Sequence, residues 1–218
     1  MSRLIAPNIS VSLDGFATGE GQSLESPFGH AGVRLHQWFF ATPTWPGHHP
    51  GEEQTLAPGA EEDDVFARRA FEGFGAEIMG AGKYGPPGWQ DDPDWQGWWG
   101  EEPPFHSPVF VLTHRPRPSL ALGETTFHFL DQAPEEALRQ AREAAGDLDV
   151  RLGGGPTTIR EFLSADLVDA LHLVMVPVVL GRGERIWDGQ EGLEERFDLR
   201  STTTGSGVTH LEFTRKPR

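Results

Sequence analysis

The chain contains no cysteine and has few basic residues, and both shortages restrict what it can do. Without cysteine there can be no disulfide, no thiol nucleophile, no iron–sulfur cluster and no thiolate zinc site. The 218 residues include 18 basic and 33 acidic ones, which gives a formal net charge of −15. Such an excess of negative charge disfavours binding to nucleic acid or to an anionic membrane. An anionic ligand would therefore need a local group of basic side chains.

Long apolar runs are also missing. The N-terminal segment MSRLIAPNIS lacks the extended apolar core of a signal peptide, and no apolar stretch is long enough to span a membrane. We therefore expect a soluble cytoplasmic protein. One α/β domain is expected over residues 1–218, because a second independent core would be cramped at this length. Segments 16–61 and 85–107 are rich in Gly, Pro and acidic residues and should form loop-rich insertions.

The clearest local pattern is a strand, a glycine turn, a helix and a second strand between residues 150 and 187. A short β-prone run reaches Gly153-Gly154-Gly155, and Pro156 follows where the first turn of a helix tolerates proline. Apolar residues at three- and four-residue spacing, ending at Leu167, predict the helix. The apolar run 171–180 predicts a strand buried on both faces, as in a mostly parallel sheet. Amides at this helix start favour phosphate, and a packing turn without a ligand is an equally good interpretation.

Further strands and helices are predicted on both sides of this unit. The sequence favours strands at 3–13, 76–79, 109–113 and 125–130, helices at 33–40, 61–71 and 134–145, and a closing hairpin of 197–203 with 208–214. The tryptophan-rich segment 89–99 has no periodic pattern and should fold down on the domain, cover a ligand or join a subunit interface, because tryptophan needs burial; packing on the domain is the leading interpretation. The adjacent His48 and His49 lack a third ligand, so no metal site is expected.

The end of the first strand carries a candidate carboxylate. Ser12 and Asp14 are two residues apart and point the same way, so Asp14 could meet a substrate in the cleft outside the sheet. The alternative is a structural turn, because Asp-Gly is a common tight-turn pair. From this feature alone the turn is favoured.

Basic side chains follow two other predicted strands. Lys83 stands in a second glycine turn, after Gly80, where it could neutralise a phosphate or be an ordinary surface lysine. Arg115 and Arg117 follow the strand that ends at Thr113. Arginines at the carboxyl end of a strand suit a 2′-phosphate, which would select NADP over NAD. A solvated basic turn is the alternative interpretation of this pair.

Six motifs stand in a recognisable order along nearly the whole chain. They are SLDG at 12–15, IMG at 78–80, VFVLT at 109–113, GGGP at 153–156, LVD at 167–169 and PVVLGRG at 177–183. No single motif is specific, but the ordered set resembles the dihydrofolate-reductase-like family that includes the reductase domain of bacterial riboflavin biosynthesis. This resemblance implies a three-layer α/β/α fold with a mostly parallel central sheet and an antiparallel C-terminal hairpin. It also implies NADPH as the hydride donor, and a homodimer.

The resemblance implies where the cofactor would bind. Amides around residues 154–158 would hold the pyrophosphate, and Gly80 and Thr113 would lie along the cofactor. The residues of the first group that we expect to contribute are Gly154, Gly155, Thr157 and Thr158.

Three positions depart from the riboflavin reductases. In those enzymes a lysine is usual where Asn8 stands, a glutamate where Gly153 stands, and an arginine where Ala81 stands. The first two changes remove charged groups expected near a phosphoribosyl-pyrimidine, so this substrate is disfavoured.

We therefore expect an NADPH-dependent reductase that transfers a hydride to a small heterocyclic or carbonyl-bearing substrate. Asp14, assisted by Ser12, is the candidate for anchoring the substrate or supplying a proton. The main alternative is a non-catalytic dimeric member of the same fold that binds a small molecule without oxidising NADPH. A flavin-assisted reductase, which would be yellow when purified, is a second enzymatic alternative.

Overall fold

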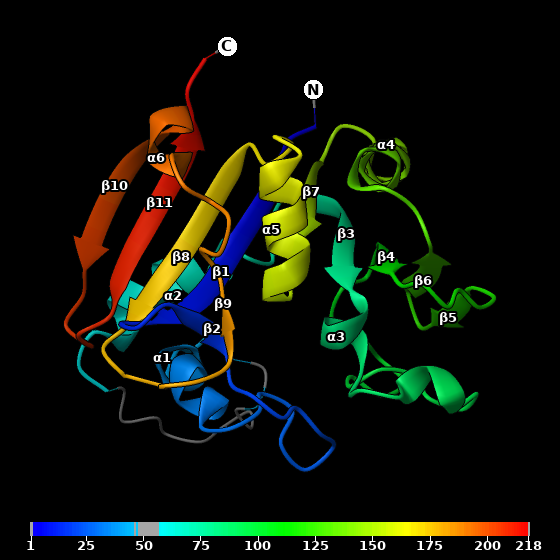
Figure 1. The fold of residues 1–218 in the computed structure, drawn as a ribbon, viewed down its shortest axis with the longest axis horizontal. Coiled ribbons are helices and arrows are strands. Elements are labelled where there is room, and N and C mark those ends of the chain that lie inside the picture. Colours follow the sequence, from blue (N-terminus) through cyan, green and yellow to red (C-terminus); the bar gives the residue numbers. More distant parts are fainter. Residues whose placement is uncertain (1, 46, 48–56, 218) are drawn as a thin grey trace.

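A nine-stranded sheet forms the middle of the molecule (Figure 1), and its strand order is β10-β11-β8-β1-β7-β3-β4-β6-β5. The computed structural model describes residues 2–45, 47 and 57–217. In chain order, the strands of the sheet are β1 (Leu4–Ser12), β3 (Phe74–Gly80), β4 (Pro108–Leu112), β5 (Leu120–Leu122), β6 (Thr125–Leu130), β7 (Asp149–Leu152), β8 (Ala170–Val176), β10 (Phe197–Thr203) and β11 (Thr209–Arg215). All neighbouring pairs from β8 to β6 are parallel, while β5 and β11 pair antiparallel with their neighbours. The mostly parallel sheet and its closing hairpin confirm the predicted fold.

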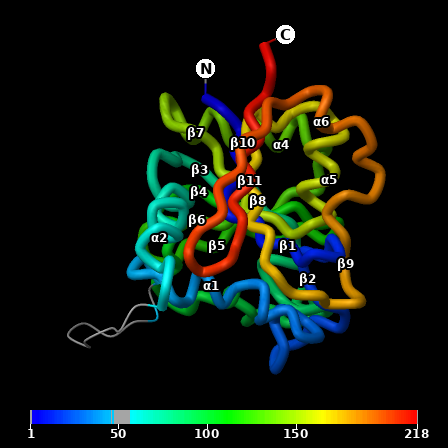
Figure 2. Tube along the Cα trace, turned by 90° about the vertical axis from the view of Figure 1, so that its left-hand side faces the viewer, coloured from blue at the N-terminus to red at the C-terminus, as the bar shows by residue number. Residues whose placement is uncertain are grey.

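Helices cover both faces of the sheet and make the fold three-layered. The helices are η1 (Gly32–His36), α1 (Gln37–Phe40), α2 (Ala60–Arg68), α3 (Ala81–Tyr84), η2 (Trp89–Asp91), α4 (Pro134–Ala145), α5 (Pro156–Ser164) and α6 (Leu193–Arg196). Figure 2 shows α2 and α5 on opposite sides of the sheet. We call the side covered by α4 and α5 the back face, although α5 is turned toward the viewer in Figure 1. The opposite side, covered by α1, α2 and the tryptophan-rich segment, is the front face. A separate two-stranded sheet pairs β2 (Phe16–Thr18) with β9 (Glu184–Arg185).

The period-two alternation of the strands divides the core between the two faces. On β8, Leu171 and Leu173 pack in the back-face core with the apolar side of α5, whereas Val174 and Val176 pack on the front face. This arrangement confirms that β8 is buried on both sides. A fully buried side chain such as Phe162 of α5 contributes about 1.5–3 kcal/mol to stability.

The front face carries two separate apolar clusters. The α2 cluster contains Trp38, Ala67 and Val174, and lies over β1, β8 and β11. The tryptophan cluster contains Tyr84 and Trp89, and lies over β3, β4 and β6. Trp89 is buried, so the segment folds down on the domain as predicted. The strip of sheet between the two clusters belongs to β7 and β3.

Three element ends lie three or four residues from the predicted ones. The helix predicted to include Leu167 ends at Ser164, because Asp166 adopts a positive φ of 59° and leaves the helical region. β8 ends at Val176, because Pro177 has no amide proton for the sheet. Helix α2 begins at Ala60 and ends at Arg68, so Phe71 lies beyond the helix and is 42 % exposed instead of packing on its apolar side.

Several of the shortest elements were not predicted from the sequence. The segment after Gly80, predicted as a turn, forms the helical turn α3, and β2, β5 and β9 contain only two or three residues each. His48 and His49 lie outside the described residues. No helix in the described part of the chain is long and apolar enough to cross a membrane.

Candidate functional site

The parallel strands bring most of the predicted site residues to one edge of the sheet, which we call the carboxyl edge. Because β1, β3, β4 and β7 are parallel, their carboxyl ends lie together, at the bottom of the sheet in Figure 1. The predicted residues that follow these strands are Ser12 and Asp14, Gly80 and Lys83, Thr113, Arg115 and Arg117, and Gly154, Gly155, Thr157 and Thr158. Four segments that are far apart in the sequence thus meet at this edge.

The two glycine turns touch each other at the carboxyl edge. The amide of Gly80 donates a hydrogen bond of 2.7 Å to the carbonyl oxygen of Gly154. A Cβ on Gly80 would overlap the hydroxyl of Thr158, so this approach requires glycine. A Cβ on Gly82 or Gly155 would meet no atom within 4 Å, so open space lies beside both turns. The first turn of α5 has no side-chain cap, and its amides are suited to an anion.

A carboxylate already lies beside this helix start. The hydroxyl of Thr157 donates a hydrogen bond of 3.2 Å to Oε2 of Glu184, which comes from β9. The helix dipole favours negative charge at this position, so Glu184 competes with any anionic ligand of α5. Sequence reasoning missed Glu184, because a two-residue strand leaves no periodic signal.

Asp14 holds the turn between β1 and the segment after β8. Its carboxylate accepts hydrogen bonds from the amides of Leu180, at 3.1 Å, and Gly181, at 2.7 Å. A hydrogen bond from Ser12 and these two amides lower the pKa of Asp14 to about 2, against the opposing effect of burial. A carboxyl group with this pKa is ionised at neutral pH and has no proton to donate. Of the two predicted roles of Asp14, only the anchoring of a substrate is compatible with this state.

The two arginines after β4 both have partners. Arg115 forms an ion pair of 2.5 Å with Asp91 on the protein surface. Arg117 donates hydrogen bonds to the hydroxyl of Tyr84, at 2.8 Å, and to the carbonyl oxygen of Trp95, at 2.5 Å. Arg117 therefore fastens the tryptophan-rich segment to the sheet. Neither guanidinium is a free cation in this arrangement.

Lys83 belongs to a cluster of three charged side chains on the front face, which we call the charged triad. Its Nζ lies 2.6 Å from Oε1 of Glu77, and the other carboxylate oxygen of Glu77 lies 3.2 Å from NH1 of Arg151. The side chains of Glu77, Lys83 and Arg151 are 3 %, 23 % and 17 % exposed. Burial lowers the pKa of Lys83, and Glu77 opposes this shift. The strand residues Glu77 and Arg151 were missed, although Glu77 interrupts an otherwise uncharged strand.

Gly153 makes room for the charged triad. A Cβ at this position would overlap Oε1 of Glu77 and Nζ of Lys83. The position where riboflavin reductases usually carry a glutamate is therefore filled, in this chain, by a carboxylate that comes from the neighbouring strand β3. A negative charge is present here although the sequence motif lacks it.

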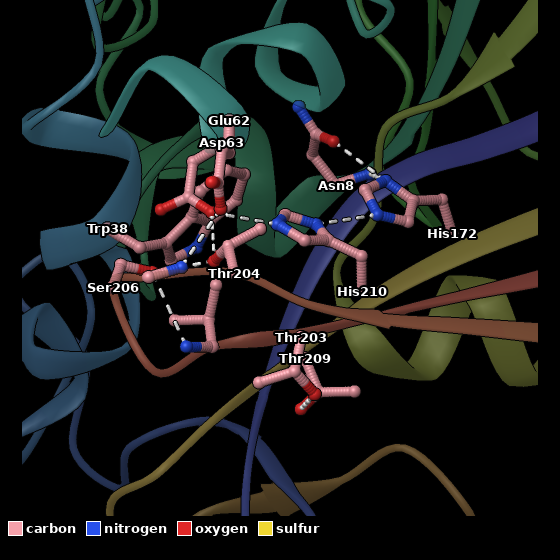
Figure 3. Close-up of polar contacts among 12 residues, drawn as sticks. Asn8, Trp38, Glu62, Asp63, His172, Thr203, Thr204, Ser206, Thr209 and His210 are labelled. Atoms are coloured by element: carbon pink, nitrogen blue, oxygen red, sulfur yellow. Dashed lines mark hydrogen bonds and ion pairs between the residues drawn. The ribbon is translucent and has the colours of Figure 1, made fainter. Parts of the chain in front are cut away.

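A second buried polar cluster, the histidine chain, crosses the front face beneath α2. Figure 3 shows Asp63 of α2, His210 of β11, His172 of β8 and Asn8 of β1 joined in a row. Oδ1 of Asp63 lies 3.0 Å from Nε2 of His210, Nδ1 of His210 lies 3.1 Å from Nε2 of His172, and Nδ1 of His172 lies 2.8 Å from Oδ1 of Asn8. The ring of Phe66 stacks on His210 at 3.9 Å. Four elements are joined by this row of contacts.

Asn8 contacts Nδ1 of His172 through two of its groups. Its backbone nitrogen lies 3.3 Å and its Oδ1 lies 2.8 Å from this ring nitrogen, while its side-chain amide donates to the carbonyl oxygen of Ala67. Burial lowers the pKa of His172 to about 3, so this ring is neutral and carries one ring proton. The pKa of Asp63 is lowered, because hydrogen bonds from His210 and Thr204 outweigh the opposing effect of burial. The carboxylate of Asp63 therefore accepts hydrogen bonds at one end of the row.

The histidine chain does not have the composition of a metal centre. Within residues 2–45, 47 and 57–217, no three His, Asp or Glu side chains are placed to hold a metal ion. The row of contacts is therefore interpreted as a structural hydrogen-bond network.

The fold agrees with comparisons to known proteins. The family model described as the RibD C-terminal domain matches residues 3–211. The chain belongs to this family. No curated protein sequence matches the chain significantly.

Solved structures of RibD-like and dihydrofolate-reductase-like proteins share the fold. A putative riboflavin biosynthesis protein from Shewanella sp. PV-4 is 19 % identical with a TM-score of 0.55, and each chain is covered in full. A deaminase/reductase from Thermotoga maritima is 16 % identical with a TM-score of 0.54, over 99 % of this chain and 57 % of that one. Dihydrofolate reductase from Enterococcus faecalis, complexed with NADP(H), is 14 % identical with a TM-score of 0.53, over 99 % of this chain and 97 % of that one. At these identities the likeness establishes the fold alone.

Proposed function

We propose that this RibD-like domain is a reductase that binds NADPH at the carboxyl edge and reduces a small heterocyclic or carbonyl-bearing substrate. The observation that carries the proposal is the contact between the Gly80 and Gly154 turns, with open space over Gly82 and Gly155 beside them. The family supports it, because the RibD-like and dihydrofolate-reductase neighbours are named as reductases.

The residues of the carboxyl edge fit a nicotinamide dinucleotide. Open space beside the two turns lets the cofactor approach the backbone, and the amides at the start of α5 can receive its pyrophosphate. Gly80 and Thr113 would lie along the cofactor. When bound, NADPH supplies the hydride, and the protein supplies binding, orientation and exclusion of water. Asp14 would contribute as a carboxylate that anchors the substrate or the loop after β8.

Titration of NADPH into the purified protein tests the proposal. Fluorescence or calorimetry should detect saturable binding, and the absence of any signal at millimolar NADPH would overturn the reductase assignment. Gly82→Asp should weaken this binding about tenfold or more, because it places a carboxylate in the open space beside the turns. Gly82→Ala is the matched control, since it changes the backbone in the same way without adding charge, and it should bind NADPH as the wild type does.

One observation favours the non-catalytic alternative. Glu184 lies beside the start of α5, and the predicted phosphate-binding residues Arg115 and Arg117 are engaged elsewhere. A protein that binds a small molecule but neither binds nor oxidises NADPH would establish this alternative. Colourless protein after purification would argue against the flavin-assisted reductase.

We also propose that the protein is a homodimer. β10 is an edge strand, and its apolar Leu199 is 54 % exposed. An exposed edge strand with free backbone groups can pair with a second copy. Light scattering of the purified protein would measure the mass, and Leu199→Pro should convert a dimer formed through β10 into a monomer.

A further inference from the structure

The charged triad contains more positive than negative charge, although its members are largely buried. Two cations, Lys83 and Arg151, share the single carboxylate of Glu77, which leaves one net positive charge. In addition, Nε of Arg151 and Oε2 of Glu77 are buried, and neither has a hydrogen-bond partner among the described residues. A buried cation without full compensation is costly, and a protein of net charge −15 has ample acidic side chains with which to neutralise it.

Aromatic rings lie beside both cations without supplying a strong hydrogen-bond acceptor. Nζ of Lys83 lies 5.7 Å from the ring centre of Phe105, and Cζ of Arg151 lies 5.1 Å from that of Phe71. A ring face attracts a cation but offers it no hydrogen-bond acceptor as strong as a carboxylate or water. An anion that reaches Lys83 and Arg151 would supply the acceptor that these rings do not.

The position of the triad connects it to the candidate site. Glu77 and Arg151 are paired residues on the adjacent strands β3 and β7, in the strip between the two front-face clusters. Glu77 and Lys83 lie against Gly153, which immediately precedes the Gly154 turn. A molecule bound next to a cofactor at this turn would therefore be within reach of the triad.

We propose that Lys83 and Arg151 form an anion subsite, organised by Glu77, that binds a carboxylate or phosphate group of the substrate. Glu77 holds the two cations together and leaves one positive charge for the ligand. The word substrate rests on the proposed reductase function, whereas the anion subsite itself does not. The substrate is accordingly an acid, although the protein as a whole is strongly acidic.

Binding of two simple anions tests the subsite. Inorganic phosphate and benzoate are titrated separately into the full chain at low ionic strength, with calorimetric detection, because salt screens such interactions. Lys83→Gln and Arg151→Gln should each weaken binding about tenfold, equivalent to about 1.4 kcal/mol. Arg200→Gln is the matched control, since it removes the same charge from an exposed position on β10, and it should leave binding unchanged.

Glu77→Gln separates a ligand site from a purely structural ion cluster. The change raises the surplus from one positive charge to two, so anion binding should become about threefold tighter or more. A structural cluster would instead lose its order, and binding would weaken with all three substitutions. If Glu77→Gln does not fold, the rise in melting temperature with phosphate is compared between the wild type and Lys83→Gln, and only the wild type should be stabilised.

Anion titrations in the presence of NADPH distinguish a substrate subsite from part of the cofactor site. With saturating NADPH present, both anions should still bind, as expected for a substrate subsite. Displacement of phosphate and benzoate by NADPH would overturn the proposal and assign the cations to the cofactor. Wild type that binds neither anion, or a control that weakens like Lys83→Gln, would also overturn it. Failure of NADPH to bind, with anion binding intact, would remove the reductase function and leave the subsite.

Discussion

The histidine chain and the charged triad are both buried on the front face, but their charges are balanced differently. In the histidine chain the carboxylate of Asp63 faces one imidazole ring, that of His210, and every ring nitrogen has a partner. In the triad the carboxylate of Glu77 faces two cations, and neither Nε of Arg151 nor Oε2 of Glu77 has a hydrogen-bond partner within the described part of the chain. The histidine chain leaves a single acceptor oxygen of Asp63 unbonded.

This difference assigns a structural role to the histidine chain and a ligand-binding role to the charged triad. The histidine chain has no surplus of cations and all of its ring nitrogens have partners, so its role is to join α2 to the sheet. A cluster with surplus positive charge and partial exposure gains an anion readily. Burial alone would have ranked the histidine chain as the stronger functional candidate, whereas charge balance ranks the triad first.

The largest effect is expected from breaking the histidine chain at its carboxylate. Asp63→Ala removes the acceptor of Nε2 of His210 and of the Thr204 hydroxyl, and each buried group left unsatisfied costs about 1–3 kcal/mol, so the free energy of unfolding in urea should fall by about 2–6 kcal/mol. Glu61→Gln, an exposed change in the first turn of the same helix, should alter stability by less than about 0.5 kcal/mol. A similar loss in both variants would mean that charge near α2, and not the buried pair, is what matters.

Acid should weaken the histidine chain before the rest of the front face. Burial and the neighbouring His210 and Arg69 lower the pKa of His172 to about 3 from an ordinary value of 6.5. Between these two pKa values the unfolded chain binds a proton at His172 and the folded state does not. The free energy of unfolding therefore falls as the pH drops below about 6.5. Between about pH 6.5 and pH 5 the loss should reach roughly 2 kcal/mol.

Variants of single histidines assign this loss. Burial also lowers the pKa of His36 to about 4, which adds to the loss in the same direction. His172→Gln should therefore reduce the slope of stability against pH without abolishing it, while the surface change His114→Gln should preserve the slope. A slope that survives His172→Gln unchanged would place the titrating group elsewhere.

Filling the space over the charged triad should damage it with little harm elsewhere. Gly153→Ala adds a Cβ that overlaps the Glu77–Lys83 pair, and such overpacking costs about 1–3 kcal/mol. Phosphate and benzoate binding should be lost together with this stability. Gly82→Ala, where the added Cβ meets open space, should retain both properties. Equal phosphate affinity of the two variants would show that Gly153 does not contribute to the subsite.

The smallest effect is expected at the start of α5. Glu184→Gln removes the carboxylate beside Thr157 and should tighten NADPH binding about two- to fivefold, in keeping with a dipole contribution of about 0.3–1 kcal/mol. Phosphate binding at the triad should stay the same, because Glu184 is not one of its contacts. Unchanged NADPH affinity would show that the pyrophosphate does not use this helix start.

The sequence was sufficient for the fold because its signals are local. Apolar periodicity located the helix Pro134–Ala145 and the strand Thr125–Leu130 to the residue. Element ends were less predictable: a positive φ at Asp166 ends α5 early, and arginines from other elements, Arg196 and Arg215, hold that residue. Such long-range contacts leave no trace in a local window.

The site was only partly predictable for the same reason. Both glycine turns were found, because glycine before a helix is a local signal. The partners of Lys83 were not, because Glu77 and Arg151 meet it only when β3 and β7 pair in the sheet. The histidine chain joins residues 8, 63, 172 and 210, and the bonding of each histidine depends on residues from other elements. The sequence signal that could have been noticed is the single charge of Glu77 within an otherwise uncharged strand.

The placement of β1 has a consequence for how the sheet is made. β1 precedes the other strands of the sheet in the chain, yet its neighbours in the sheet are β7 and β8, which end at Leu152 and Val176. Its buried residues Leu4 and Ala6 therefore have no strand to pair with until those two strands have been synthesised. The histidine chain closes later still, when β11 brings His210 to α2. During synthesis β1 consequently depends on protection from aggregation until its neighbours have left the ribosome.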